Sequence, residues 1–389
     1  MPYQQFGTEW SRLGVLRYKL QMVAELWRGV TRLSVATGIP AFELIRRYRA
    51  IRRAIPASPL EFFRYRLWDD ARSWHDRTSF LTWAERRPLE RFLNPKSLAE
   101  QVKSKLRGDA FFDTHHLPVP RRIGSWPPPG GGDLATLTAL VAESASGVVI
   151  KPEHGDSGDR VLVFARCDGD RLQHAGGEWW AMSRLHSVLD TQGDAWLIQE
   201  RVTAHPELAA LAGTSFAATL RLVSCRHDDG SVFLLPATLK LPSPLSGIDN
   251  FGAGNVAVAV DDHGVLGGAA HGLDGPIIDH HPTTGIAFAG RRVPHFAEAV
   301  EVVRRGQAAL PGLRSVGWDV AITPDGPRIL EANAWWGLDV TQQPGLRGIA
   351  RGEFVEFLEE IGAGGVLKQR ESYATTAQAR RLRRGDPSV

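Results

Sequence analysis

The sequence has 389 residues, of which 43% are hydrophobic and 23% charged, and this balance excludes a chain that is disordered throughout. No apolar run reaches the roughly 20 residues that a membrane-spanning helix needs, and the first residues lack the pattern of a secretory leader. Cys167 and Cys225 are too few for a disulfide framework or a zinc site. We therefore expect a cytoplasmic protein.

The net charge of +3 conceals three regions of different sign. Residues 1–107 hold 21 Lys and Arg against 10 Asp and Glu, residues 108–367 hold 19 against 31, and residues 368–389 hold 6 against 2. A basic arm suits nucleic acid, an anionic membrane surface, or a solvated helical face that packs on the acidic part. We favour the last and expect no nucleic acid partner, while docking to a membrane or a protein through the basic arm stays open.

The first 90 residues predict helices, because apolar residues recur there at intervals of three or four. The first such face consists of Leu13, Leu16, Leu20, Val23, Leu26 and Trp27. Residues 58–74 predict a second, packed helix, with Ser58 as its N-cap and Pro59 in its first position. Proline and glycine at 126–133 predict a linker, and helical spacing resumes at 134–144.

From residue 147 onward the pattern changes to short strands with a few helices. Turn sequences at 227–230, 261–264 and 324–326 join neighbouring strands, so the predicted sheets are mainly antiparallel. The predicted strands are 147–151, 160–166, 195–202, 218–226, 231–241, 256–261, 317–323 and 327–333, and the predicted helices are 178–190, 295–310 and 351–361.

Two carboxylates and an amide form the strongest candidate site. Residues two apart in a strand face the same side, so Glu331 and Asn333 project together. If residues 324–326 form a three-residue hairpin loop, Asp319 lies opposite Glu331. Three oxygen-bearing side chains on one sheet face suit a hard cation such as Mg²⁺.

Two further segments place polar groups at strand ends. Lys151 ends a strand and precedes a loop with Gly155, Ser157 and Gly158, in which backbone N–H groups can approach a phosphate. This loop is not a P-loop, because it lacks the GxxxxGK[ST] sequence and a strand follows it. The strand at 197–202 ends with polar residues. Backbone groups at such a strand end can pair with the edge of an adenine base.

In this order, the segments resemble the sugar-transfer-associated branch of the ATP-grasp superfamily. The resemblance rests on SPLEFFRYRLW (58–68), LNPKSLAEQVKSKL (93–106), THHLPVP (114–120), VVIKPEHGDSGDRV (148–161), LIQERVTAHPEL (197–208), ATLRLVS (218–224), IDNFGAGN (248–255), VGWDVAITPDG (316–326) and ILEANAWWGLD (329–339). It implies an α+β ATP-grasp fold, in which two α+β subdomains clamp a nucleotide, preceded by a helical N-terminal region.

The resemblance also implies a division of the chain. The expected parts are a helical N-terminal region (1–92), a pre-ATP-grasp segment with the Pro/Gly linker (93–132), a first ATP-grasp subdomain with the glycine-loop hairpin (133–200), a second subdomain with the metal and acceptor site (201–365), and a basic tail (366–389).

The family uses ATP with Mg²⁺, two ions being expected, and the resemblance assigns a role to each candidate residue. For the phosphates, Lys105 is expected at the α-phosphate, Lys151 at the α- and β-phosphates, and Gly155, Ser157 and Gly158 over the β- and γ-phosphates. For the nucleoside, Gln199, Glu200 and Val202 are expected at the adenine and Glu207 at the ribose. Asp319, Glu331 and Asn333 are expected at the metal, and Arg221 and Lys240 at the transferred phosphoryl group.

The implied activity is an ADP-forming ligase, which activates a small-molecule carboxylate as an acyl phosphate that an amine captures, in cell-surface glycan or secondary-metabolite assembly. Asn250, Asp339 and Gln342 are expected to shape the acceptor pocket, where the pair Trp335-Trp336 departs from many ligases. Two alternatives stay open: a kinase that phosphorylates a sugar-like hydroxyl, and a non-catalytic nucleotide-binding partner of a glycan-assembly system.

Overall fold

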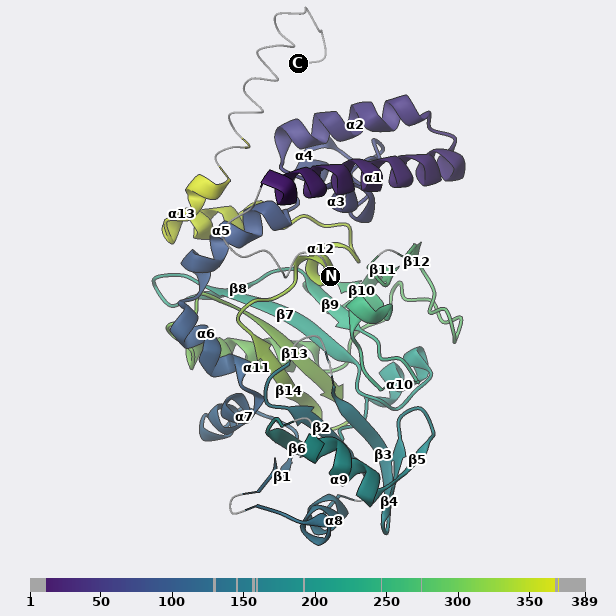
Figure 1. The fold of residues 1–389 in the computed structure, drawn as a ribbon. Helices are drawn as coiled ribbons and strands as arrows, with labels where there is room; N and C mark the ends of the chain where they lie inside the picture. Colours follow the sequence, from purple (N-terminus) through teal and green to yellow (C-terminus); the bar gives the residue numbers. More distant parts are fainter. Residues whose placement is uncertain are drawn as a thin grey trace, which may run out of the picture. The chain divides into compact units, whose positions relative to one another are not determined.

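A computed structural model describes residues 12–128, 131–144, 146–155, 158, 160–191, 193–245, 247–273, 275–367 and 370 (Figure 1). These residues form two compact units. The first takes the described residues up to Leu89, together with Gly348–Val355 and those from Gly362 onward, and the second takes Glu90–Arg347 and Glu356–Ile361. The domain boundaries predicted from the sequence stay a prediction.

The first unit is helical, as its apolar spacing predicted. Its helices are α1 (Arg12–Thr37), α2 (Ala41–Ala54), α3 (Pro59–Arg64), α4 (Trp74–Thr78) and the first part of α5 (Trp83–Leu93). Gly29 lets α1 approach α3 closely, because a Cβ atom at this position would lie 2.1 Å from the Phe63 ring.

The helix predicted at 58–74 is correct in its start and wrong in its length. Ser58 caps α3 through a capping box with Glu61, as the sequence predicted for the N-cap. The helix ends at Arg64, because the chain then turns through Arg66, which has a left-handed φ of 49°. Helix α4 begins only at Trp74, after its own N-cap, Ser73.

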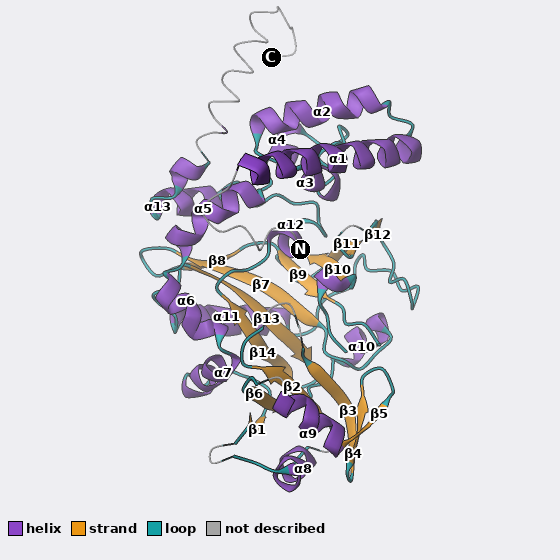
Figure 2. Ribbon diagram, in the orientation of Figure 1, coloured by secondary structure: helices purple, strands orange, loops and turns teal. Residues whose placement is uncertain are grey.

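The second unit contains two antiparallel sheets (Figure 2). The six strands of the first are, in spatial order, β1 (Arg122–Trp126), β6 (Trp196–Glu200), β2 (Val148–Pro152), β3 (Leu162–Asp168), β4 (Arg171–His174) and β5 (Trp179–Ala181). Helices α8 (Leu134–Ala142) and α9 (Met182–Thr191) share one apolar core with this sheet, to which Trp196 and Ile198 contribute. Because strand side chains alternate, Leu197 and Gln199 face the opposite side.

The second sheet carries all three metal-site candidates, Asp319, Glu331 and Asn333. Its path is β12 (Ile277–Ile278), β11 (Leu266–His271), β10 (Val256–Val260), β9 (Ala237–Lys240), β7 (Thr219–Arg226), β13 (Ser315–Thr323) and β14 (Gly326–Asn333), and β8 (Val232–Leu234) pairs with β7. All pairs in both sheets are antiparallel. The single strand predicted at 231–241 is wrong: it is two strands, β8 and β9, with Pro236 between them.

Helices cover the second sheet and join it to the preceding segment. The remaining helices are α6 (Lys96–Lys103), α7 (Lys105–Thr114), α10 (Pro206–Ala212), α11 (Phe296–Ala308), α12 (Leu338–Gln342) and α13 (Glu353–Glu360), with short 3₁₀ turns at Phe251–Ala253 and Gly364–Val366. Val102 of α6 and Phe112 of α7 belong to the same core as Trp318 of β13. Throughout the described part of the chain, no helix is both long and apolar enough to cross a bilayer.

Candidate functional site

The hairpin of β13 and β14 places the two candidate metal carboxylates opposite each other. Thr323 pairs with Gly326, so the loop has two residues and the predicted three-residue loop is wrong. A bulge at Leu330 then shifts the register by one residue, and the predicted pairing of Asp319 with Glu331 is confirmed. The bulge therefore sets which side chains share the site.

Arg221, Asp319 and Glu331 form a row across three neighbouring strands. Arg221 on β7 pairs in register with Asp319, and its Nε and NH2 groups donate to the two carboxylate oxygens at 2.8 Å each. Lys240 Nζ lies 3.0 Å from the same carboxylate. Burial alone would raise the pKa of Asp319, but the two cations outweigh it and hold that pKa far below its ordinary value. Asp319 is thus a permanent carboxylate.

Glu331 has a different environment. No cation lies within ion-pair distance of it in the described part of the chain, and burial raises its pKa above the ordinary value, an effect that the charge of Lys105 partly offsets. Two residues on, Asn333 has a buried side-chain nitrogen without a hydrogen-bond partner among the described residues. Both groups lie in the strand that carries the bulge, and both have unused hydrogen-bonding or ion-pairing capacity.

Lys151 joins the two sheets. Its Nζ donates to Gln199 Oε1 at 2.9 Å within the first sheet and to the carbonyl of bulged Leu330 in the second sheet at 3.3 Å. Burial lowers the pKa of Lys151, and the charge of Glu331 acts against this shift. An ammonium in this position is available to an anion between the sheets.

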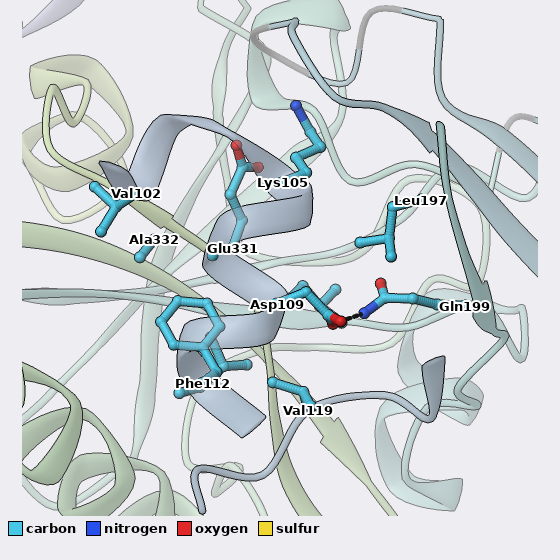
Figure 3. A pocket seen from close by; sticks show the side chains of 12 residues that line it. Val102, Lys105, Asp109, Phe112, Val119, Leu197, Gln199, Glu331 and Ala332 are labelled. Carbon is cyan, nitrogen blue, oxygen red and sulfur yellow. Dashed lines mark hydrogen bonds between the residues drawn. The ribbon is translucent and has the colours of Figure 1, made fainter. Parts of the chain in front are cut away.

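A pocket opens beside these groups (Figure 3). It contains about 320 Å³ of empty space, part of which is open solvent, and its walls come from α6, α7, β6 and β14. Lys105 and Glu331 lie at one end of the view, and Asp109 and Gln199 meet at the side, with Phe112 below them. The lining residues are Val102, Lys105, Gly108, Asp109, Phe112, Val119, Leu197, Gln199, Ile329, Leu330, Glu331 and Ala332. A mostly apolar pocket with a charged end suits a nucleotide.

The glycine loop is described in part. Lys105 Nζ donates to the carbonyl of Gly155 at 2.7 Å, which ties the first turn of α7 to this loop. Gly158 has a left-handed φ of 73°, and a Cβ atom there would lie 3.0 Å from Ile248. Only glycine takes this conformation without strain. Ser157 lies outside the described residues.

The adenine and ribose candidates do not all come together. Gln199 lines the pocket, but the Glu200 carboxylate faces away from it and binds Arg121 at 2.9 Å and Ser146 at 2.8 Å. Val202 is half-buried beyond the end of β6, where only its backbone is a candidate for pairing with a base. Glu207 is exposed in the first turn of α10, and among the described residues no contact of its carboxylate joins it to the groups above.

The sequence did not point to three polar residues of the site, Asp109, Asp249 and Thr219. Asp109 accepts a hydrogen bond from Gln199 Nε2 at 2.6 Å, and burial raises its pKa. Asp249 lies 3.2 Å from Lys240 Nζ and accepts a short hydrogen bond from the Thr219 hydroxyl. Asp109 follows Lys105 by four residues, one helical turn, and this spacing is a signal that could have found it.

The acceptor candidates have structural contacts. Asn250 accepts a hydrogen bond from the Gly252 backbone at 2.9 Å and caps a 3₁₀ turn, and Gln342 is fully buried. Asp339 is half-buried in the first turn of α12. The two tryptophans differ: Trp336 is buried and donates to Ser315 Oγ at 2.9 Å, while Trp335 is 38% exposed. Of the pair, Trp335 alone is available to a ligand.

Several solved structures resemble the fold weakly. They include N5-carboxyaminoimidazole ribonucleotide synthetase from Thermotoga maritima, with 14% identity, 60% of this chain and 42% of that chain covered, and a TM-score of 0.35. D-alanyl-alanine synthetase A from Vibrio cholerae has 8% identity, coverage of 69% and 66%, and a TM-score of 0.43. The biotin carboxylase domain of Hydrogenobacter thermophilus 2-oxoglutarate carboxylase, in complex with MgADP, ADP and bicarbonate, has 11% identity, coverage of 68% and 51%, and a TM-score of 0.39.

Likenesses this weak carry no argument about function, and the chain spans only about half the length of the first solved proteins it matches. No curated protein matches the sequence. The family comparison is decisive: the profile described as sugar-transfer associated ATP-grasp matches residues 84–353, well over half of the chain. It covers the row of Arg221, Asp319 and Glu331 and both sheets around it. The chain belongs to the sugar-transfer associated ATP-grasp family, and its α+β architecture is the ATP-grasp fold.

Proposed function

We propose that the protein is an ATP- and Mg²⁺-dependent ligase, which activates a carboxylate as an acyl phosphate and joins it to an amine. The observation that carries this proposal is the charged row of the second sheet. Arg221 and Lys240 converge on Asp319, and Glu331 lies opposite it without an ion pair in the described residues. Such an arrangement suits the transfer of a phosphoryl group between two anionic molecules.

The balance of charge in the site supports a nucleoside triphosphate that binds together with divalent cations. Four cationic side chains contribute to the site: Lys105, Lys151, Arg221 and Lys240. They face the carboxylates of Asp319, Glu331 and Asp249. Protein cations alone therefore cannot neutralise a triphosphate in addition to these carboxylates, which calls for divalent cations.

The residues fit Mg²⁺. Glu331 is a carboxylate without an ion pair in the described chain, Asp319 is fixed in its charged form, and the side-chain nitrogen of Asn333 is buried and unpaired. Mg²⁺ prefers oxygen ligands, and these three residues would hold it through their carboxylate oxygens and, at Asn333, through the amide oxygen rather than the unpaired nitrogen, with two ions proposed. When bound there, the metal would supply positive charge that neutralises the negative charge developing on the phosphate during transfer.

The nucleotide would use both sheets. Lys151 and Lys105 provide the positive charge for its α- and β-phosphates, and the backbone around Gly155 and Gly158 would cover the outer phosphates. The pocket of Figure 3 would take its apolar part, with Gln199 in the wall. We propose that Val202 pairs with the base through its backbone, and we keep Glu207 as the ribose candidate.

The chemistry has two steps. An oxygen of the substrate carboxylate attacks the γ-phosphorus, the bond from this phosphorus to ADP breaks, and an acyl phosphate results. The amine nitrogen then attacks the carbonyl carbon, inorganic phosphate leaves, and the nitrogen loses a proton to solvent. Arg221 and Lys240 would hold the charged phosphoryl oxygens in both steps, since their positions are fixed by Asp319.

The test is ATP turnover with Mg²⁺ and pooled amino acids, amino sugars and sugar acids. We expect release of free phosphate that requires both a carboxylate and an amine and is lost in Glu331→Gln. Glu301→Gln, an exposed residue of α11, is the matched control and should retain turnover. Formation of ADP and a phosphorylated sugar without free phosphate would replace the ligase by a kinase, and nucleotide binding without any turnover would favour the non-catalytic role.

A further inference from the structure

Helix α1 exposes an apolar stripe that the described residues of its own unit do not cover. Leu16, Leu20, Val23 and Trp27 are 53%, 61%, 66% and 62% exposed, and we name these four residues the α1 stripe. At about 100° per residue they fall within an arc of roughly 60° on the helix. Large apolar side chains grouped in this way mark an interaction surface.

The opposite side of the helix is already occupied. Gly29, about 150° from the centre of the stripe by helix geometry, is buried, and the ring of Phe63 on α3 touches the helix there. Packing on α2 and α3 therefore fixes α1 with the stripe directed outward, and the stripe is not the face that holds the unit together.

Charged residues are arranged around the stripe in a specific way. Arg17 and Arg28 lie about 90° and 110° from its centre on one side and Lys19 about 70° on the other, by helix geometry, and all three are exposed. The acidic residue of the described helix, Glu25, lies on the far side, near Gln21, which donates to it at 2.9 Å. The apolar arc is thus bordered by cations on both flanks.

We propose that the α1 stripe binds the surface of an anionic lipid bilayer, with the helix lying in the plane of the interface. Leucine, valine and tryptophan side chains would enter the boundary between headgroups and acyl chains. Arginine and lysine on the two flanks reach the lipid phosphates with their long side chains. The exposed Phe42 and Arg49 of neighbouring α2 add apolar and positive surface to the same unit.

The charges disfavour a second copy of this chain as the occupant of the stripe. In a second copy of this helix, cations would face cations along both flanks, which opposes close pairing. A helix with apolar side chains along one arc and cations on both flanks suits binding parallel to the bilayer surface. An acidic helix of a partner protein has compatible charge, and the experiment separates it from lipid because only lipid is added.

The experiment is sedimentation of the full chain with vesicles. Vesicles of phosphatidylcholine alone are compared with vesicles that also contain phosphatidylglycerol, at low and at high salt. We expect sedimentation with the anionic vesicles only, weakened by high salt because screening reduces the attraction. Absence of binding to anionic vesicles at low salt overturns the proposal, whatever the enzymatic activity turns out to be.

Matched variants identify the surface. Leu20→Ser with Trp27→Ser should reduce the bound fraction about tenfold or more. Leu134→Ser with Leu245→Ser, two exposed leucines of the other unit, should leave it unchanged. Because all four side chains are exposed, circular dichroism should show intact folding in both double variants.

A second pair of variants tests the charges. Arg17→Gln with Arg28→Gln should weaken binding to anionic vesicles about tenfold, while Arg304→Gln with Arg305→Gln, exposed cations of α11, should not. Equal binding by the wild type and by the stripe variant, Leu20→Ser with Trp27→Ser, would overturn the proposal. So would a wild-type dimer in solution that the stripe variant lacks, since a second copy would then occupy the stripe.

Discussion

At the scale of single residues, the two carboxylates of the site have opposite electrostatic surroundings. Asp319 is held by Arg221 and Lys240, which keep its pKa low, whereas burial raises the pKa of Glu331 and no ion pair compensates it in the described chain. The desolvation cost of a buried carboxylate is offset only by a partner. Binding of a cation at Glu331 would therefore relieve an unfavourable desolvation energy.

This difference predicts that Glu331→Gln stabilises the protein in the absence of metal and nucleotide. The raised pKa means that the folded protein binds more protons than the unfolded chain at pH values above the ordinary 4.5 of a glutamate. In the wild type, ionisation of this group therefore lowers the free energy of unfolding as pH rises through this window. The variant lacks the ionising group, so it lacks this decrease. The unfolding temperature of the variant should exceed that of the wild type by a few degrees near neutral pH, and the gap should close toward pH 4.

Thermal unfolding at several pH values between about 4 and 8 measures this gap. Glu301→Gln, on the exposed side of α11, should show no gap that grows with pH in the same way. A stability difference for Glu331→Gln that is constant over the whole range, or negative at neutral pH, would contradict the assigned environment of Glu331.

At the scale of elements, α11 approaches the second sheet through one glycine. A Cβ atom on Gly306 would lie 2.6 Å from the ring of Trp318 on β13, and both residues are buried. By contrast, a Cβ atom on Gly108 of α7 would have its nearest neighbour at 3.7 Å, an ordinary contact distance. The two helical glycines therefore differ in the space around them.

These distances predict opposite effects of the same substitution. Alanine favours a helix over glycine by about 1 kcal/mol, so Gly108→Ala should be neutral or stabilising. Gly306→Ala should instead destabilise by about 1–3 kcal/mol, because helix and sheet must separate around the new methyl group. Urea unfolding of the two variants measures both values, and a shift of the two in the same direction would refute the packing argument.

The sequence predicted elements well where the chain is regular. The spacing of Glu331 and Asn333 and the turn before them led to the correct partner for Asp319, but the bulge at Leu330 could not be seen, since it depends on how the whole hairpin twists. Asp109 was missed for a related reason. Its neighbour Gln199 is 90 residues away in the chain, so their contact exists only once α7 packs beside β6.

Function and surface were harder to predict than elements. The roles assigned to Glu200 and Glu207 come from the family resemblance, yet the Glu200 carboxylate binds Arg121 and Ser146 instead of lining the pocket. The apolar spacing of α1 correctly indicated a helix. Spacing alone cannot show which of two apolar faces packs, and the stripe that includes Leu20 and Trp27 is the exposed one.

At the scale of the whole molecule, the described chain divides into two units, to which we assign different tasks. The residues proposed to bind nucleotide and metal all belong to the unit that contains Glu90–Arg347, while the α1 stripe belongs to the other. A ligand that binds the folded state stabilises what it contacts, by about 2.7 kcal/mol at a concentration of one hundred times its Kd. The two tasks should therefore be separable by measurements that report on each segment.

Hydrogen exchange provides such a measurement. Addition of ADP with Mg²⁺ should slow amide exchange in β2, β6 and β14, because these strands carry the lysine, the pocket wall and the metal residues. Exchange in α1 and α2 should not change. The protection should require Mg²⁺ and should be reduced in Glu331→Gln but not in Glu301→Gln. Protection spread evenly over α1, α2 and the strands would show instead that the two units respond as one body, and the assignment of nucleotide binding to one unit would fail.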